Sequence, residues 1–148
     1  MITDLELYRK AALAAARAYA PYSDYHVGAA VLASSGRVYV GANIENASYG
    51  ATICAERAAV SKAVFEGEKN ITAIAVAAYA GTAGSDAQSG APAYPCGICR
   101  QFLSEFGGDI RVIVGADEEH LERYTISELL PKAFTNGFKS DTGLTEGE

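Results

Sequence analysis

The chain has 148 residues, of which 49% are hydrophobic and 20% are charged. This length and composition fit one soluble globular domain with a sizeable core, and no apolar run is long and charge-free enough to span a bilayer. The net charge of -6 argues against a polynucleotide partner, because phosphate binding relies on a basic face, but it leaves a single nucleoside open.

Hydrophobic periodicity and turn residues predict alternating helices and strands along the chain. We expect helices at 4–20, 54–66 and 97–106 and a short one within 126–134. We expect two strands within 27–45, on either side of a turn at 34–36, and further strands at 71–80, 110–116 and, more weakly, 121–125. A loop is expected at 81–94. The first helix opens with a capping box at Thr3 and Glu6 and stops before Pro21. Its apolar residues at helical spacing are Leu5, Tyr8, Ala12, Leu13, Ala16 and Tyr19.

This element order predicts an α/β protein with a mixed sheet and helices on both faces. The strand at 71–80 is a continuous apolar run, as expected for a strand that is covered on both sides. We expect a single domain over 1–136 and a flexible tail over 137–148. The N-terminus lacks the apolar stretch of a secretory leader, so we expect a cytoplasmic protein.

Three cysteines are candidate metal ligands, because each lies at or near the start of a predicted helix. Cys54 opens one helix, and Cys96 and Cys99 form a Cys-x-x-Cys pair at the start of another. Thiolates are favoured at helix N-termini, and three of them suit one Zn²⁺ ion with its fourth position open to water. The alternative is a redox pair plus an unrelated buried cysteine.

Charged side chains beside these cysteines suggest acid–base chemistry. Glu56 can share a site with Cys54 only at the first helical turn, where it could accept a proton from activated water. Arg57 and Arg100 could donate hydrogen bonds to the sulfurs and offset their negative charge, although a surface ion pair is the plainer reading of each arginine.

The segment Cys54-Ala-Glu56 followed by Pro95-Cys96-x-x-Cys99 resembles the signature of the zinc nucleobase deaminases. The chain is further similar to the small homotetrameric cytidine deaminases in APYSDYHVGAAV (20–31), GANIENASYG (41–50), CAERAAV (54–60), PCGICRQFLSEF (95–106) and ELLPKAF (128–134). The resemblance implies a three-layer α/β/α fold with a mixed, mostly five-stranded sheet, and one Zn²⁺ per chain.

The resemblance also implies a reaction. Water activated at the zinc attacks C4 of the cytosine ring of cytidine or deoxycytidine, Glu56 moves the protons, and ammonia leaves to give uridine or deoxyuridine, in pyrimidine salvage. Asn43 and Glu45 alternate along a strand and match the pair that holds the 3′ hydroxyl, whereas local capping of a turn is the plainer reading of both.

Other positions follow from the same resemblance. Ala55 and Tyr25 are expected to contact the substrate, and Tyr25 stands where the family usually has phenylalanine. Tyr49 and Phe134 match residues that reach a neighbouring subunit's site, with own-chain core packing as the alternative. The loop at 81–94 is longer than usual, and Tyr94 stands where serine is common, so this loop could change which modified cytidines fit.

Three other functions remain open at this point. One is a related aminohydrolase that acts on N4-substituted or ring-substituted cytidines or on a blasticidin-type nucleoside. A second is a polynucleotide editor, which the net charge of -6 and the lack of a basic stretch disfavour. The third is a structural zinc or redox module, which would need a fourth protein ligand; the two histidines, His26 and His120, lie outside the motif segments.

Overall fold

The computed structural model describes residues 1–81 and 91–136. The helices are α1 Asp4–Ala15, α2 Ala55–Phe65, α3 Gly97–Ser104 and α4 Ile126–Leu129, with a 3-10 turn η1 at Tyr49–Ala51. The strands are β1 Tyr25–Ala33, β2 Val38–Ala42, β3 Ile71–Ala80, β4 Arg111–Gly115 and β5 Leu121–Thr125. No helix within the described ranges is long and apolar enough to cross a membrane.

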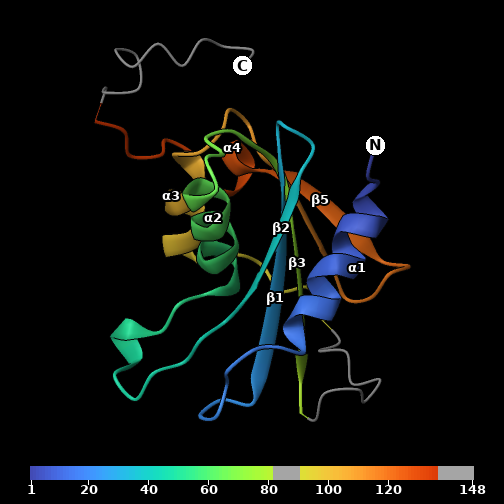
Figure 1. Cartoon of the computed structure of the whole chain (residues 1–148), viewed down its shortest axis with the longest axis vertical. Helices are drawn as coiled ribbons and strands as arrows, with labels where there is room; N and C mark the ends of the chain where they lie inside the picture. Colours follow the sequence, from blue (N-terminus) through green and yellow to red (C-terminus); the bar gives the residue numbers. More distant parts are fainter. Residues whose placement is uncertain (82–90, 137–148) are drawn as a thin grey trace.

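The five strands form one mixed sheet in the order β2-β1-β3-β4-β5. β1 runs antiparallel to both β2 and β3, β3 and β4 are parallel, and β5 returns antiparallel to β4. Figure 1 shows α1 on one side of the sheet and α2 and α3 on the other. The expected three-layer fold with a mixed five-stranded sheet is therefore confirmed.

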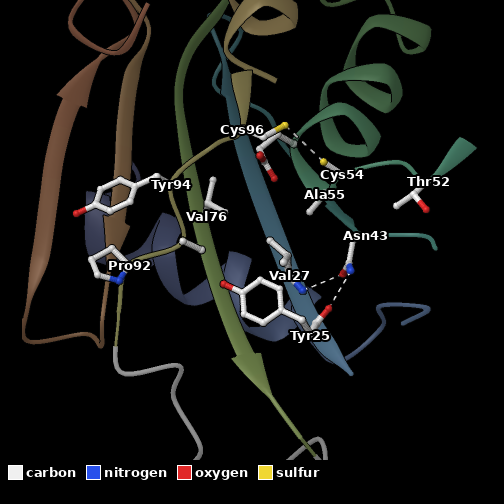
Figure 2. Close-up of a pocket in the computed structure, with 12 residues that line it drawn as sticks. Tyr25, Val27, Asn43, Thr52, Cys54, Ala55, Val76, Pro92, Tyr94 and Cys96 are labelled. Atoms are coloured by element: carbon white, nitrogen blue, oxygen red, sulfur yellow. Dashed lines mark hydrogen bonds between the residues drawn. The ribbon is translucent and has the colours of Figure 1, made fainter. Parts of the chain in front are cut away.

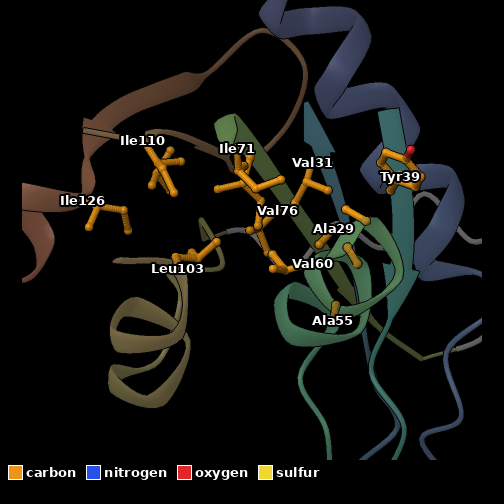
Figure 3. Close-up of a cluster of buried hydrophobic side chains, with 14 of the residues drawn as sticks. Ala29, Val31, Tyr39, Ala55, Val60, Ile71, Val76, Leu103, Ile110 and Ile126 are labelled. Carbon is orange, nitrogen blue, oxygen red and sulfur yellow. The ribbon is translucent and has the colours of Figure 1, made fainter. Parts of the chain in front are cut away.

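The central strand β3 is buried on both faces, as its apolar sequence predicts. Ile74 and Val76 join the core beneath α2 and α3, while Ala73 and Ala75 join the core beneath α1. Figure 3 shows the first of these cores, in which Val60 of α2 and Leu103 of α3 lie over Val76. The small residues of β3 on the α1 side let that helix lie close to the sheet.

Helix α1 begins as predicted but ends five residues earlier. The capping box is present, with Thr3 N donating to Glu6 Oε2 at 2.7 Å and Glu6 N donating to Thr3 Oγ1 at 3.2 Å. After Ala15 the chain leaves the helix, because Tyr19 N donates to Asn43 O instead of continuing the helical ladder. The predicted apolar face is also mostly wrong. Of its six residues only Tyr8 is buried and Leu5 is half-buried, whereas the other four, Ala12, Leu13, Ala16 and Tyr19, are exposed. The buried residues of α1 are Leu7, Tyr8, Ala11, Ala14 and Ala15.

Candidate active site

Two helix N-termini meet on one side of the sheet and bring the three cysteines together. Cys54 is the N-cap residue of α2, Cys96 is the N-cap residue of α3, and Cys99 lies in the first turn of α3. The Sγ atoms of Cys54 and Cys96 are 3.8 Å apart, and all three sulfurs lie within 4.8 Å of one another. The predicted cysteine cluster is therefore present.

The cluster fits one zinc ion. A tetrahedral site with Zn–S bonds of about 2.3 Å places its sulfurs roughly 3.8 Å apart, which is the separation found between Cys54 and Cys96. Three sulfur donors leave one tetrahedral position for a ligand from solvent, which is the pattern of catalytic zinc sites. Among the described residues, this is the one His, Cys, Asp or Glu cluster of metal-binding geometry.

Contacts within the cluster move the thiol pKa values in opposite directions. A hydrogen bond from the Cys99 thiol lowers the pKa of Cys54 to about 5, and Arg57 adds to this against the opposing effect of burial. The same contact with Cys54, together with burial, raises the pKa of Cys99.

The two arginines occupy different positions. Arg57 lies against Cys54 and Cys99, and this contact raises its own pKa, while its Nη2 donates to Thr52 O at 3.3 Å. Arg100 differs from the expectation that it donates to sulfur. Its Nε donates to Pro95 O and its Nη1 to Leu129 O, each at 2.8 Å, so that it ties the turn before Cys96 to the end of α4.

A cavity of about 380 Å³ opens beside the cysteines. Its wall is formed by β1, β3, the start of α2, the residues that follow β2, and the segment that precedes α3. The lining residues are Tyr25, Val27, Asn43, Thr52, Cys54, Ala55, Glu56, Val76, Pro92, Ala93, Tyr94 and Cys96. Figure 2 shows Cys54 and Cys96 at one end of this cavity and Tyr25 at the other.

Glu56 is the buried acid of the cavity. It lies in the first turn of α2, directly after Ala55, and is 4% exposed. Burial raises the pKa of its carboxyl, and the charge of Cys54 acts in the same direction, although the backbone N–H of Glu56 opposes the shift. A buried carboxyl with a raised pKa beside a metal site is suited to both taking and giving a proton.

Asn43 lines the cavity, and its amide is also part of the sheet. Its Oδ1 accepts from Val27 N at 2.8 Å, and its Nδ2 donates to Tyr25 O at 2.9 Å. One N–H and one lone pair of the amide remain for a ligand. Both the structural and the binding interpretation of Asn43 therefore have a physical basis.

Glu45 lies outside the cavity lining and caps a turn. Its Oε1 accepts from Tyr22 N and Ser23 N at 2.9 and 3.2 Å, and its Oε2 accepts from Ser23 Oγ at 2.6 Å. The Ser23 hydroxyl has the largest effect in lowering the pKa of Glu45. β2 ends at Ala42, so Asn43 and Glu45 follow the strand, yet both reach residues 22–27 at the entry to β1.

The aromatic candidates separate into two groups. Tyr25 faces the cavity, where burial and the charge of Glu56 raise the pKa of its hydroxyl. Tyr49 and Phe134 lie outside the cavity and are 75% and 76% exposed, so packing in the core of their own chain is excluded. His26 is paired with Asp24 and stacked on Tyr79, away from the cavity lining.

Several lining residues carry no signal in the sequence. Val27 and Val76 read as ordinary strand residues, and Thr52 precedes the cysteine motif. Pro92 and Ala93 belong to the predicted loop, whose residues 82–90 lie outside the described part of the chain. Only the side-chain alternation of β1 and β3 could have suggested that Val27 and Val76 share the face of α2.

The fold and the site together define a class of protein: an α/β/α zinc protein with an open metal position and a buried carboxyl beside it. Residues 1–116 match the family described as the cytidine and deoxycytidylate deaminase zinc-binding region. A cytidine deaminase from Halalkalibacterium halodurans is 46% identical over 130 residues, covering 87% of this chain and 92% of the relative. A probable cytidine deaminase from Dictyostelium discoideum is 43% identical over 118 residues, covering 80% of this chain and 74% of the relative.

Solved structures agree with these sequence relatives. The crystal structure of cytidine deaminase from Burkholderia pseudomallei superposes with a TM-score of 0.78 at 38% identity and covers 90% of this chain and all of that chain. The cytidine deaminase of Mycobacterium tuberculosis gives a TM-score of 0.72 at 38% identity over 91% of this chain and 99% of that one. The chain belongs to the cytidine and deoxycytidylate deaminase family.

Proposed function

We propose that the protein is a zinc-dependent deaminase that hydrolyses cytidine and deoxycytidine to uridine and deoxyuridine with release of ammonia. The observation that carries this proposal is the buried Glu56 carboxyl in a cavity beside three clustered cysteines. Relatives that match most of this chain are named cytidine deaminases, which supports the choice of substrate.

In this proposal Cys54, Cys96 and Cys99 hold the metal and Glu56 moves the protons. Zinc, when bound, supplies Lewis-acid chemistry that makes a nucleophile from water near neutral pH. Glu56 accepts one proton of the water and passes it to ring nitrogen N3 as the water oxygen bonds to C4. It then takes the remaining proton from the new hydroxyl at C4 and delivers it to the amine, so that the C4–N bond breaks as the C4 carbonyl forms. The amine leaves as ammonia, and the carboxyl returns to its starting state.

Other residues would orient the nucleoside. The free N–H and lone pair of Asn43 are available to a ribose hydroxyl, and the ring of Tyr25 and the first turn of α2 at Ala55 border the base. Glu45 would hold the 3′ hydroxyl beside the turn that it caps. A site that reads the 3′ hydroxyl accepts both ribose and deoxyribose.

Arg57 and Arg100 have separate proposed tasks. Arg57 would offset the charge of the thiolates that it touches, which would otherwise weaken the Lewis acidity of the metal. Arg100 would keep Cys96 in place through its two backbone carbonyl contacts.

We further propose that one domain over residues 1–136 carries the activity and that four copies assemble. Tyr49 and Phe134 support an assembly, because both are large aromatic side chains left exposed outside their own cavity. In a homotetramer they would reach a neighbouring subunit's site. A cytoplasmic place in pyrimidine salvage is consistent with a free nucleoside substrate. Light scattering of the purified protein measures the assembly directly.

The test of the proposed function is ammonia release from cytidine by the zinc-loaded protein and by its Glu56→Ala variant. We expect the wild type to release ammonia and the variant to keep its zinc but lose roughly 10²- to 10⁴-fold in kcat, because the proton carrier is gone. A zinc-loaded wild type that leaves both cytidine and deoxycytidine unchanged would refute the proposal.

A further inference from the structure

Tyr94 forms one wall of the cavity and is tied to a distant strand. Its hydroxyl donates to Glu122 of β5, at 3.0 Å from Oε1 and 3.1 Å from Oε2. Tyr124 donates to the same carboxylate at 2.6 Å, and the two tyrosine rings meet edge to face with centroids 6.0 Å apart. Hydrogen bonds to a carboxylate are stronger than neutral ones, so the Tyr94 ring is held at both its backbone and its hydroxyl.

This arrangement depends on the pairing of β5 in the sheet. Glu122 and Tyr124 are two residues apart on the strand and therefore point to the same face. That face is the one covered by α2 and α3, because Tyr124 packs against their core. The edge strand thus presents a carboxylate and a second aromatic ring to the segment that leads into α3.

The position of Tyr94 in the cavity indicates which part of a base it would meet. In Figure 2 Tyr94 and Pro92 lie on one side of Val76, and Ala55 and Thr52 lie on the other. In the proposed reaction N3 of cytosine faces Glu56, which follows Ala55 in the first turn of α2. N3 and C5 are the two ring neighbours of C4, so when N3 faces the start of α2, C5 lies on the other side of C4, toward Pro92 and Tyr94.

We propose that Tyr94 is a specificity-determining residue that limits the size of a substituent on C5 of the cytosine ring. Glu122 is the positioning residue that keeps the Tyr94 ring in the wall. This inference rests on the proposed function, because it uses the orientation of the base that the reaction requires. The substrate class that it concerns is cytidines that carry a methyl group or a larger substituent on C5.

The exposure of Tyr94 is consistent with a wall and not with a core position. Its side chain is 48% exposed, so the ring packs too little to be explained as a core residue, yet its hydroxyl is fixed by a carboxylate. A freely rotating surface tyrosine would not define a boundary for a substituent, whereas an anchored ring can.

The test compares kcat/KM for 5-methylcytidine and for cytidine in the zinc-loaded wild type, in Tyr94→Ala and in Tyr94→Phe. We expect the ratio of 5-methylcytidine to cytidine to rise about tenfold in Tyr94→Ala, since one methyl group in a pocket changes discrimination by at least this factor. Tyr94→Phe keeps the ring but loses the bond to Glu122, and we expect a smaller rise of about threefold.

Tyr39→Phe is the matched control. It removes another tyrosine–glutamate hydrogen bond, from Tyr39 Oη to Glu68 at 3.2 Å, at a position outside the cavity lining. We expect its ratio to equal that of the wild type. An unchanged ratio in Tyr94→Ala would overturn the proposal, and a wild-type ratio in Tyr94→Phe would overturn the positioning role of Glu122.

A binding measurement separates this inference from the proposed function. Calorimetric titration with 5-methyluridine and with uridine measures how well the cavity accepts a methyl group on C5. No reaction occurs, because these ligands carry no amine to lose. We expect the affinity for 5-methyluridine relative to uridine to rise in Tyr94→Ala by about the same factor as the kinetic ratio. Absence of ammonia release by the wild type refutes the proposed function, whereas normal release with unchanged ratios in both assays refutes only the role of Tyr94.

Discussion

Replacing Asn43 with alanine tests whether this amide supports the sheet as well as lining the cavity. The side chain is 8% exposed and bonds both Val27 N and Tyr25 O. Its removal leaves one donor and one acceptor of β1 without these partners. An unsatisfied buried group costs about 1–3 kcal/mol, and the lower half of that range applies to both bonds because they are only partly buried. Because both bonds are lost, we expect Asn43→Ala to lower the free energy of unfolding by about 2–4 kcal/mol.

Urea unfolding of the zinc-loaded protein, at equal chain concentration for every variant, measures this change. Asn46→Ala is the control, because Asn46 lies in the same segment and also accepts from a backbone N–H, that of Ser48, but on the exposed surface. We expect the control to stay within about 0.5 kcal/mol of the wild type. Equal stability of Asn43→Ala and the control would refute the structural role and leave Asn43 as a binding residue alone.

Two further predictions concern the packing and charge of the α1 layer. A Cβ at Gly28 would overlap the backbone of α1, so Gly28→Ala should lower the melting temperature by at least about 5 °C, with Gly50→Ala, which meets no atom, as the unchanged control. Burial opposes ionisation of Asp4, but hydrogen bonds from Arg123 and Arg111 outweigh it and lower the pKa of Asp4. The stability that ionised Asp4 contributes is present above the ordinary carboxyl pKa and is lost as the pH falls through the lowered pKa. Asp4→Asn should therefore be less stable than the wild type by about 1 kcal/mol at pH 7. In strong acid the two proteins should be equally stable.

Local patterns in the sequence predict most of the fold and the metal site. The cysteines lie at helix N-termini, and the Cys-x-x-Cys spacing places Cys96 and Cys99 in one helical turn. The apolar run of β3 is covered on both faces, as expected for a strand whose sequence is continuously apolar and does not alternate. These features are determined by residues that lie close together in the chain, so they can be predicted from a single sequence.

The features that the sequence does not predict depend on contacts between distant segments. The end of α1 depends on a backbone hydrogen bond to the residues after β2, which Tyr19 N donates to Asn43 O. No residue near position 15 indicates this end in the sequence. The contact of Tyr94 with Glu122 spans 28 positions. The bond from Arg100 to Leu129 O follows from the approach of α4 to α3, which the proximity of Arg100 to the cysteines in the sequence does not indicate.

Cys54 and Cys96, the N-cap residues of α2 and α3, would also crosslink the chain if both bind the same ion. Cys54 and Cys96 are 42 positions apart, so an ion held by both would close a loop that contains α2 and β3. A crosslink over a loop of this length removes conformational entropy from the unfolded chain worth roughly 4 kcal/mol in the chain-entropy account. Because that cost grows only with the logarithm of loop length, residues can be added between β3 and α3 at a cost of a few tenths of a kcal/mol. The segment before α3 can therefore vary in length at little conformational cost while Cys54 and Cys96 still reach the same ion.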